Sequence, residues 1–214
     1  MRLLTLLVIT YLLLSFLQLA WTLWLNFSLT SKIAGTVGVR VLQPCSIRLS
    51  EGWNLVSLCM KPDNLSISAI LKDIDYRYVL RWNRSRQEFD IYSPRSSQNP
   101  FTEWDPNESY FIYYRNQTGW LEVAGEEFGD LEIPLLVGWN APSYPYLFST
   151  NISRYLSCLD YRYLMKWNTS QQAWTIFSPR ATVKPFWLIY RGEGQFLLMR
   201  SDGVLKYNKS LLQS

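Results

Sequence analysis

The feature that most constrains the fold is a nine-residue stretch that occurs twice. Residues 75–83 read Asp-Tyr-Arg-Tyr-Val-Leu-Arg-Trp-Asn, and residues 160–168 read Asp-Tyr-Arg-Tyr-Leu-Met-Lys-Trp-Asn, 85 positions later. Side chains of two kinds alternate in both copies, which is typical of a half-buried β-strand. We therefore expect two copies of one β module, each with its tyrosine and tryptophan face in the core. An exposed aromatic strip for ligand binding is the alternative.

Matches on both sides of this stretch extend the repeat. Gly52-Trp-Asn54 corresponds to residues 138–140. Further on, Phe111-Ile-Tyr-Tyr-Arg115 resembles Trp187-Leu-Ile-Tyr-Arg191 at an offset of 76. This alignment predicts that the second copy lacks nine residues, corresponding to the region 98–106.

One short helix is expected in each copy. Apolar residues recur with helical spacing over residues 66–75, and Ser66 and Asn151 occupy matching N-cap positions in the two copies. The remaining elements predicted for the first copy are a hairpin at 46–60 and strands at 76–83, 88–93, 109–115 and 119–124. The predicted fold class is α+β, dominated by antiparallel strands.

The N-terminal part of the chain has a different character. Residues 3–29 carry no charged side chain and are rich in Leu. As a helix this run would be about 40 Å long, against a bilayer core of about 30 Å. It predicts an uncleaved transmembrane signal anchor over residues 1–30, held in membrane lipid, with a cleaved signal peptide as the alternative. A stalk at 31–43, module 1 at 44–128 and module 2 at 129–210 would follow.

Asparagine is concentrated in glycosylation sequons. Eight of the 11 Asn residues lie in Asn-x-Ser/Thr with x not Pro, whereas the Ser and Thr content predicts about two. They are Asn26 and the predicted glycosylation sites Asn64, Asn83, Asn107, Asn116, Asn151, Asn168 and Asn208. The alternative is accident in a Ser-rich chain. The excess favours an exported N-glycoprotein of the cell membrane, with its ectodomain on the extracellular side.

Three cysteines are present. A hairpin centred on Gly52 would place Cys45 opposite Cys59, which predicts a disulfide and an oxidising exterior. Two free thiols are the alternative. Cys158 has no counterpart in the first copy and is interpreted as a lone thiol, with intermolecular pairing left open.

The sequence offers little for catalysis. It contains no His, no Gly-rich phosphate loop and no nucleophile elbow, so we expect no enzyme, no cofactor and no metal site. The acidic residues Glu126, Glu127, Asp130 and Glu132 are interpreted as a solvated connector, with a divalent cation site as the alternative. The net charge of +4 comes from interspersed basic residues, which argues against nucleic acid as a partner.

The order of the motifs resembles a tandem repeat of archaeal and bacterial secreted and cell-surface proteins. That repeat reads Gly-Trp-Asn-Leu-x-Ser-Leu, a small helix, Tyr-x-x-Val-x-x-Trp, Trp-x-x-Tyr-x-Pro and Gly-x-Gly-Tyr-Trp-Ile. Here the corresponding segments of the first copy are Gly52–Leu58, Tyr76–Trp82, Phe89–Pro94 and Asn107–Ile112. The last segment has Asn-Glu-Ser in place of Gly-x-Gly. The resemblance implies a surface location, and the many sequons point to an archaeal rather than a bacterial source.

These observations favour a non-catalytic, membrane-anchored cell-surface glycoprotein. Its role would be structural or interactive, with envelope proteins or other copies of itself as partners in the envelope or a surface filament. A carbohydrate-binding or adhesive module is the alternative, with Trp104 and Trp120 as its stacking platform. A pilin-like subunit ranks last, because only Met1 and Arg2 precede the apolar run.

Overall fold

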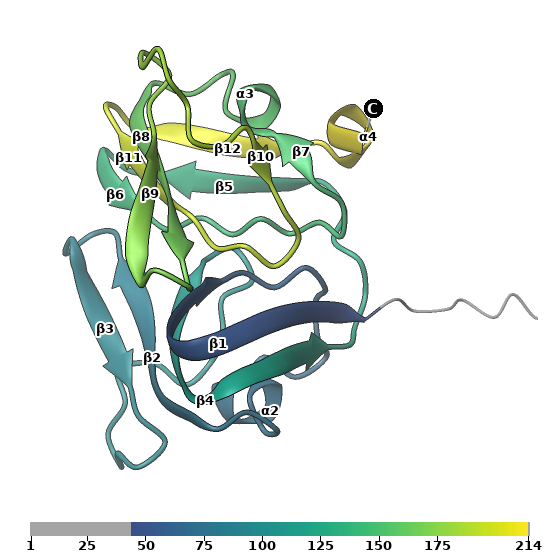
Figure 1. Cartoon of the computed structure of the whole chain (residues 1–214). Coiled ribbons are helices and arrows are strands. Elements are labelled where there is room, and N and C mark those ends of the chain that lie inside the picture. The colour runs from purple at the N-terminus through teal and green to yellow at the C-terminus, as the bar shows by residue number, and fades with distance from the viewer. Residues whose placement is uncertain (1–43, 214) are drawn as a thin grey trace, which may run out of the picture. The chain divides into compact units, whose positions relative to one another are not determined.

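The computed structural model describes residues 44–213 (Figure 1). The fold is dominated by antiparallel strands, as predicted. The strands and helix of module 1 are β1 (Cys45–Val56), α2 (Ile67–Ile70), β2 (Tyr76–Asn83), β3 (Glu88–Tyr92) and β4 (Tyr110–Val123). Those of module 2 are β5 (Leu131–Leu135), β6 (Gly138–Asn140), β7 (Thr150–Asn151), α3 (Ile152–Tyr155), β8 (Tyr161–Asn168), β9 (Ala173–Phe177), β10 (Leu188–Ile189), β11 (Phe196–Met199) and β12 (Gly203–Tyr207), and α4 (Lys209–Gln213) follows.

The predicted fold class is wrong in including a transmembrane helix. Among residues 44–213, no helix is both long enough and apolar enough to span a bilayer. The segments assigned to the anchor (1–30) and the stalk (31–43) lie outside the described residues, as does the sequon at Asn26.

The two modules share one strand order. Module 1 forms a sheet in the order β1-β4-β2-β3, and module 2 forms a sheet in the order β6-β11-β8-β9. The long β1–β4 ribbon of module 1 is divided in module 2 into two shorter pairs, β6 with β11 and β5 with β12. A short pair of β10 with β7 completes the second module.

The hairpin predicted at 46–60 is not formed. Residues 45–56 are a single strand, and both halves of it pair with β4 rather than with each other. The chain nevertheless reverses direction at Gly52, which has a φ of +91° next to a register shift. The side-chain amide of Asn54 bridges this bend by bonding to both the N–H and the C=O of Ser50. Local alternation correctly indicated strand, but it could not tell which strand is the partner.

Two further predicted elements differ in extent from those of the structure. The strands predicted at 109–115 and 119–124 are one strand, β4. The helix predicted over 66–75 is only the four residues of α2, and its counterpart α3 is equally short. Both predicted N-caps are confirmed: Ser66 accepts a hydrogen bond from the N–H of Ala69, and Asn151 accepts one from the N–H of Ser153.

The predicted nine-residue deletion in the second copy is also wrong. Phe111 of β4 pairs with Leu80 of β2, and Phe196 of β11 pairs with Met165 of β8, which are the residues 85 positions later. The offset therefore stays near 85 throughout. The sequence alignment matched Trp187 to Phe111. In the structure the carbonyl of Trp187 accepts the N–H of Ile152, just as the carbonyl of Thr102 accepts the N–H of Ile67, so Trp187 corresponds to Thr102.

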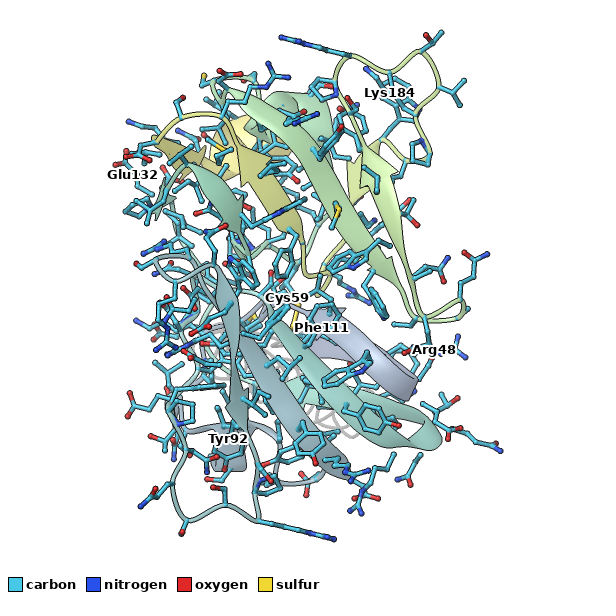
Figure 2. The ribbon with its side chains drawn as sticks, turned by 90° about the vertical axis from the view of Figure 1, so that its left-hand side faces the viewer. Arg48, Cys59, Tyr92, Phe111, Glu132 and Lys184 are labelled. Carbon is cyan, nitrogen blue, oxygen red and sulfur yellow. A yellow bond between two sulfur atoms is a disulfide. The ribbon has the colours of Figure 1, made fainter. Side chains whose placement is uncertain are left out.

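The hydrophobic residues form three clusters. One lies in each module, and the third joins the modules around Leu55, Phe111, Ala141 and Phe196. Figure 2 shows Phe111 between the two halves of the molecule.

Half of the aromatic face of the repeated strand belongs to the third cluster. Leu80 and Trp82 contribute to it, whereas Val79, on the face expected to be polar, is fully buried in the core of module 1. A register shift between Tyr76 and Tyr78 moves Tyr76 to the core side. The prediction that this whole face lines the module core is therefore wrong, because much of it lines the contact between modules.

Each module forms hydrogen bonds to the Gly-Trp-Asn bend of the other. The backbone of Trp53 donates to Gln172 Oε1 at 2.8 Å, and its carbonyl accepts from Gln172 Nε2 at 3.1 Å and from Trp167 Nε1 at 2.8 Å. The equivalent contacts at Trp139 are made by Gln87, at 2.8 and 2.9 Å, and by Trp82 Nε1, at 2.8 Å. We call these six hydrogen bonds the reciprocal clasp.

Backbone pairing between the modules is reciprocal as well. Ser57 N–H donates to the carbonyl of Gly192, and Gly194 N–H donates to that of Leu55, both at 3.1 Å. A Cβ at Gly194 would lie 2.9 Å from the backbone of Val56, so a residue with a side chain would force these segments apart. The matching pair in the other direction joins residues 107–109 to residues 141–143.

We expect Gln172→Ala and Gln87→Ala each to lower the free energy of unfolding by about 1–2 kcal/mol, because each removes two hydrogen bonds to the partner module's backbone. Urea denaturation measures the effect. Gln171→Ala is the matched control: Gln171 is exposed and bonds only within its own turn, at 3.3 Å to Asn168, so its effect should stay within about 0.5 kcal/mol. Equal effects at Gln171 and Gln172 would contradict the role of the clasp.

Candidate functional site

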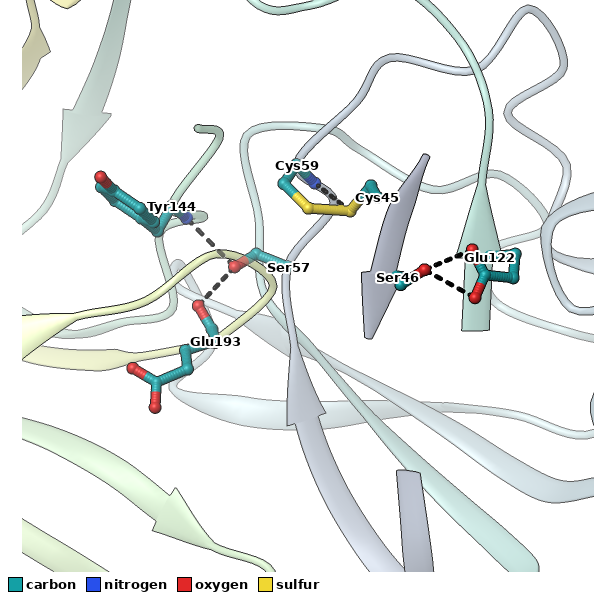
Figure 3. The surroundings of a disulfide bond; sticks show 7 residues. All are labelled: Cys45, Ser46, Ser57, Cys59, Glu122, Tyr144 and Glu193. Carbon is teal, nitrogen blue, oxygen red and sulfur yellow. Dashed lines mark hydrogen bonds between the residues drawn. A yellow bond between two sulfur atoms is a disulfide. The ribbon is translucent and has the colours of Figure 1, made fainter. Parts of the chain in front are cut away.

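The predicted disulfide between Cys45 and Cys59 is confirmed. The two Cα atoms are 5.5 Å apart, and both residues are buried. Figure 3 shows that the bond lies close to Ser57, whose hydroxyl donates to the carbonyl of Glu193 at 2.6 Å and accepts the N–H of Tyr144 at 3.1 Å. The crosslink therefore fixes the segment of module 1 that pairs with module 2. Cys158, the remaining cysteine, is exposed and free.

The sequons fall into two groups by the environment of the Asn side chain. Among the sequons in residues 44–213, Asn64 and Asn116 are exposed, whereas the other five are half-buried. Several of them close turns: the Oδ1 atoms of Asn64, Asn83, Asn151 and Asn168 each accept the backbone N–H two residues later. Because the Asn side chain closes the turn, these four Asn-x-Ser/Thr sequences also have a structural explanation that needs no glycan. Asn107 lies three residues before β4, and Asn208 directly precedes α4, where its Oδ1 accepts the N–H of Leu211 at 3.2 Å.

The two tryptophans predicted as a carbohydrate platform lie in different environments. Trp104 is only 1% exposed and packs on Tyr110, with ring centroids 4.2 Å apart, so its faces are not open to a sugar. Its counterpart in module 2 is Ile189, which is also fully buried, and this indicates that the position requires apolar volume. Trp120 is 56% exposed.

Trp120 borders a groove of about 290 Å³ between α2 and β4. The groove is lined by Pro62, Asn64, Ala69, Ile70, Lys72, Asp73, Ile74 and residues 120–124. Ala69, Ile70, Ile74 and the ring of Trp120 give it apolar lining, and Asn64, Lys72, Asp73 and Glu122 add polar groups. We call it the Trp120 groove. A flat aromatic ring beside a few polar groups is suited to stacking and hydrogen bonding with a sugar ring.

A second pair of hollows, of about 410 and 600 Å³, lies on module 2 and has a different character. The two share Arg180 and Arg200, and Arg162 and Lys184 add two further cations. We call this surface the basic groove. Figure 2 shows Lys184 on an outlying loop.

The acidic connector is engaged in ion pairs. Glu127 pairs with Lys209, Glu132 pairs with Lys206 at 3.0 Å, and Asp130 accepts the backbone N–H of Lys209. Over residues 44–213, no cluster of three or more His, Cys, Asp or Glu side chains is placed to hold a metal ion.

Glu108 is the one acidic side chain whose pKa is strongly raised, to about 7. Burial is the main cause, and the nearby charge of Asp105 adds to it. The equivalent residue in module 2, Glu193, pairs with Lys166. The residue that corresponds to Lys166 is Arg81, which bonds to Asp90 at 2.8 Å instead. Glu108 thus lies at the contact between modules without the ion pair that its counterpart has.

Comparison of the chain with protein-family models, with curated proteins and with solved structures gives no match.

Sequence reasoning missed the clasp glutamines, Glu108 and the basic groove. Gln87 and Gln172 had a readable signal, because they lie 85 positions apart and each follows its repeated Trp-Asn by the same spacing. The basic groove had none, since its four cations come from β8 and two separate loops. Glu108 is one of many acidic residues, and only its burial distinguishes it.

We expect the protein to become less stable as the pH rises from about 4.5 to 7. The folded state holds the proton of Glu108 more tightly than the unfolded chain, so stability is highest below the unfolded pKa and falls until the folded pKa is passed. The loss should not exceed about 3 kcal/mol. Denaturation between pH 4 and 8 measures it, and the absence of His keeps this window clear. Glu108→Gln should remove the trend; an unchanged slope in that variant would assign it to other groups.

Proposed function

We propose that this chain is a non-catalytic interaction protein of the cell exterior, with a role in the envelope or on a surface filament. The observation that carries the proposal is the Cys45–Cys59 disulfide. Disulfides of this kind persist in oxidising compartments and are rare in the cytosol. The exposed sequons at Asn64 and Asn116 fit an N-glycosylated product of the same compartment.

The arrangement of the two modules supports an interaction role. The reciprocal clasp and the third hydrophobic cluster join them into one unit, so residues on the outer surfaces are held at fixed separations. Each module presents one exposed tryptophan, Trp120 at 56% and Trp187 at 51%. Exposed aromatic side chains are enriched at the centres of binding surfaces.

The compartment can be tested through the cysteines. Native cells are lysed in an alkylating reagent, and the peptides are analysed by mass spectrometry. We expect Cys45 and Cys59 to be recovered as a cystine and Cys158 to be alkylated, so Cys158 serves as the internal control. Alkylation of all three cysteines would contradict an oxidising location. Reduction of the purified protein should lower its stability by about 3 kcal/mol.

Carbohydrate binding at the Trp120 groove is a second candidate function. The observation that favours it is the exposed ring of Trp120 in one groove with Asn64, Asp73 and apolar side chains. The indole face can stack on the C–H face of a sugar while the polar groups bond to its hydroxyls. Asn64 lies in the same groove, so a glycan attached there would compete with an external ligand.

We expect the full-length chain to be retarded in gels that contain a neutral polysaccharide, with cellulose derivatives, chitin derivatives and mannan as the probes. Trp120→Ala should weaken the interaction at least about tenfold, because the stacking surface is lost. Trp187→Ala is the matched control, since it also removes an exposed tryptophan but leaves this groove intact.

Two results would count against the groove. One is equal binding by the two tryptophan variants, and the other is no binding to any of the probes. The measurement is repeated with Asn64→Gln, which removes the sequon and separates competition by an attached glycan from a true lack of affinity.

A further inference from the structure

The basic groove gathers positive charge from distant parts of module 2. Arg162 comes from β8, Arg180 and Lys184 both come from the loop between β9 and β10, and Arg200 follows β11. The three arginines are exposed, and Lys184 is half-buried. Because arginine guanidinium groups present several donors in a plane, they are suited to carboxylate and sulfate groups.

The positive charge of this surface is weakly balanced. Asp160 is the one carboxylate among the groove-lining residues, and the nearest contact between Arg200 Nε and Asp160 Oδ1 is 3.7 Å. Among the described residues, neither Arg162 nor Arg180 forms an ion pair within 4 Å. The side chain of Lys184 lies over two rings instead, with its Nζ 5.2 Å from the centre of Phe177 and 5.0 Å from that of Trp187.

The pseudo-symmetry of the fold supplies an internal comparison. Arg77, Arg95 and Arg115 of module 1 occupy the positions 85 residues before Arg162, Arg180 and Arg200. Arg115 is held by a close ion pair with Asp75. Lys184 is replaced by Asn99, whose side chain closes its own loop by bonding to both the N–H and the C=O of Ser93. Module 2 therefore has one more cation and a looser ion pair at the equivalent place.

The lining of the groove favours one kind of anionic ligand. Bases of a single-stranded nucleic acid need exposed aromatic faces to stack on. Of the aromatic residues that line the groove, Tyr161 and Phe177 are buried, and the guanidinium of Arg162 lies over the ring of Tyr163 at 5.2 Å. The exposed ring of Trp187 beside the groove has Lys184 Nζ over it at 5.0 Å. Hydroxyl groups of Ser153, Ser157 and Ser178 lie among the cations and can bond to sugar hydroxyls.

We propose that the basic groove of module 2 binds an acidic polysaccharide, that is, a sugar polymer carrying carboxylate or sulfate groups. The cations neutralise the charged substituents, and the serine hydroxyls bond to the sugar ring. The site is separate from the Trp120 groove and takes a ligand of different charge, so each can be lost without the other.

The test uses the full-length chain and two probes of opposite kind, dextran sulfate and uncharged dextran of the same length. Binding is measured by fluorescence anisotropy at low and high salt. We expect the chain to bind dextran sulfate but not dextran, with an affinity that falls as salt screens the cations. Arg162→Glu/Arg180→Glu should weaken binding at least about tenfold. Polygalacturonate is the second acidic probe, and it should give the same ranking.

The matched control is Arg77→Glu/Arg95→Glu, which makes the same charge change at the equivalent positions of module 1. It should leave the affinity within about threefold, because Arg77 and Arg95 lie outside the basic groove. Its net charge equals that of the groove variant, so a difference between the two cannot come from net charge alone. All four positions are exposed, and thermal melts confirm that both variants fold.

Three results would overturn the proposal: equal losses in the two double variants, which would show attraction by net charge alone; no binding to either acidic polysaccharide; or tighter binding to a single-stranded oligonucleotide or to phosphatidylglycerol vesicles. Trp120→Ala should leave binding of dextran sulfate unchanged, so failure here is distinguishable from failure of the neutral-carbohydrate function.

Discussion

The fold depends on the way each module holds a single backbone bend of the other. At Trp53 and at Trp139, the peptide N–H and C=O follow a glycine with positive φ, in β1 and β6, which are edge strands of their sheets. These groups therefore need partners from outside the sheet. A glutamine from the opposite module supplies an acceptor and a donor at once, and a tryptophan adds a second donor to the carbonyl. The repeated residues on the two sides of this contact are therefore partners of each other rather than two copies of a core motif.

This arrangement explains why the two copies share the same residues at some positions and differ at others. Gly-Trp-Asn, Trp-Asn and the two glutamines recur because both ends of the contact need them. Away from the contact, the modules differ freely. Lys166 pairs with Glu193, whereas its counterpart Arg81 bonds to Asp90 rather than to Glu108. Asn99 closes a loop where Lys184 lies over aromatic rings. The symmetry holds the molecule together, and the departures from it give the two outer surfaces different chemistry.

Much of the secondary structure could be predicted from the sequence. Alternation located β2 and β8, N-cap chemistry located the starts of α2 and α3, and the cysteine pair was found although the hairpin used to argue for it is absent. Cys45 and Cys59 approach each other because the strand bends at Gly52, a reversal that the turn signal indicated correctly.

The sequence did not show which segments pair with each other. The sequence around Trp187 resembles that around Phe111 more than the true counterpart at Phe196 does, because aromatic identity is free to change wherever only volume matters. A constant offset, together with the glycines at 192 and 194 that match the closing Gly-x-Gly of the repeat pattern, was the better guide. The aromatic face of β2 was assigned to a module core for a similar reason. A half-buried face looks the same in sequence whether it packs on its own sheet or on a neighbouring module.

The reciprocal clasp also bears on how the chain reaches its native state. Its hydrogen bonds join residues 52 to 119 positions apart, so module 1 leaves the ribosome with its bend and its aromatic face still without partners. Until module 2 has been synthesised, that surface is complementary to the second half of any neighbouring chain. Exchange of halves between two nascent molecules would satisfy every contact described here, so a domain-swapped dimer is the natural competing product at high rates of synthesis.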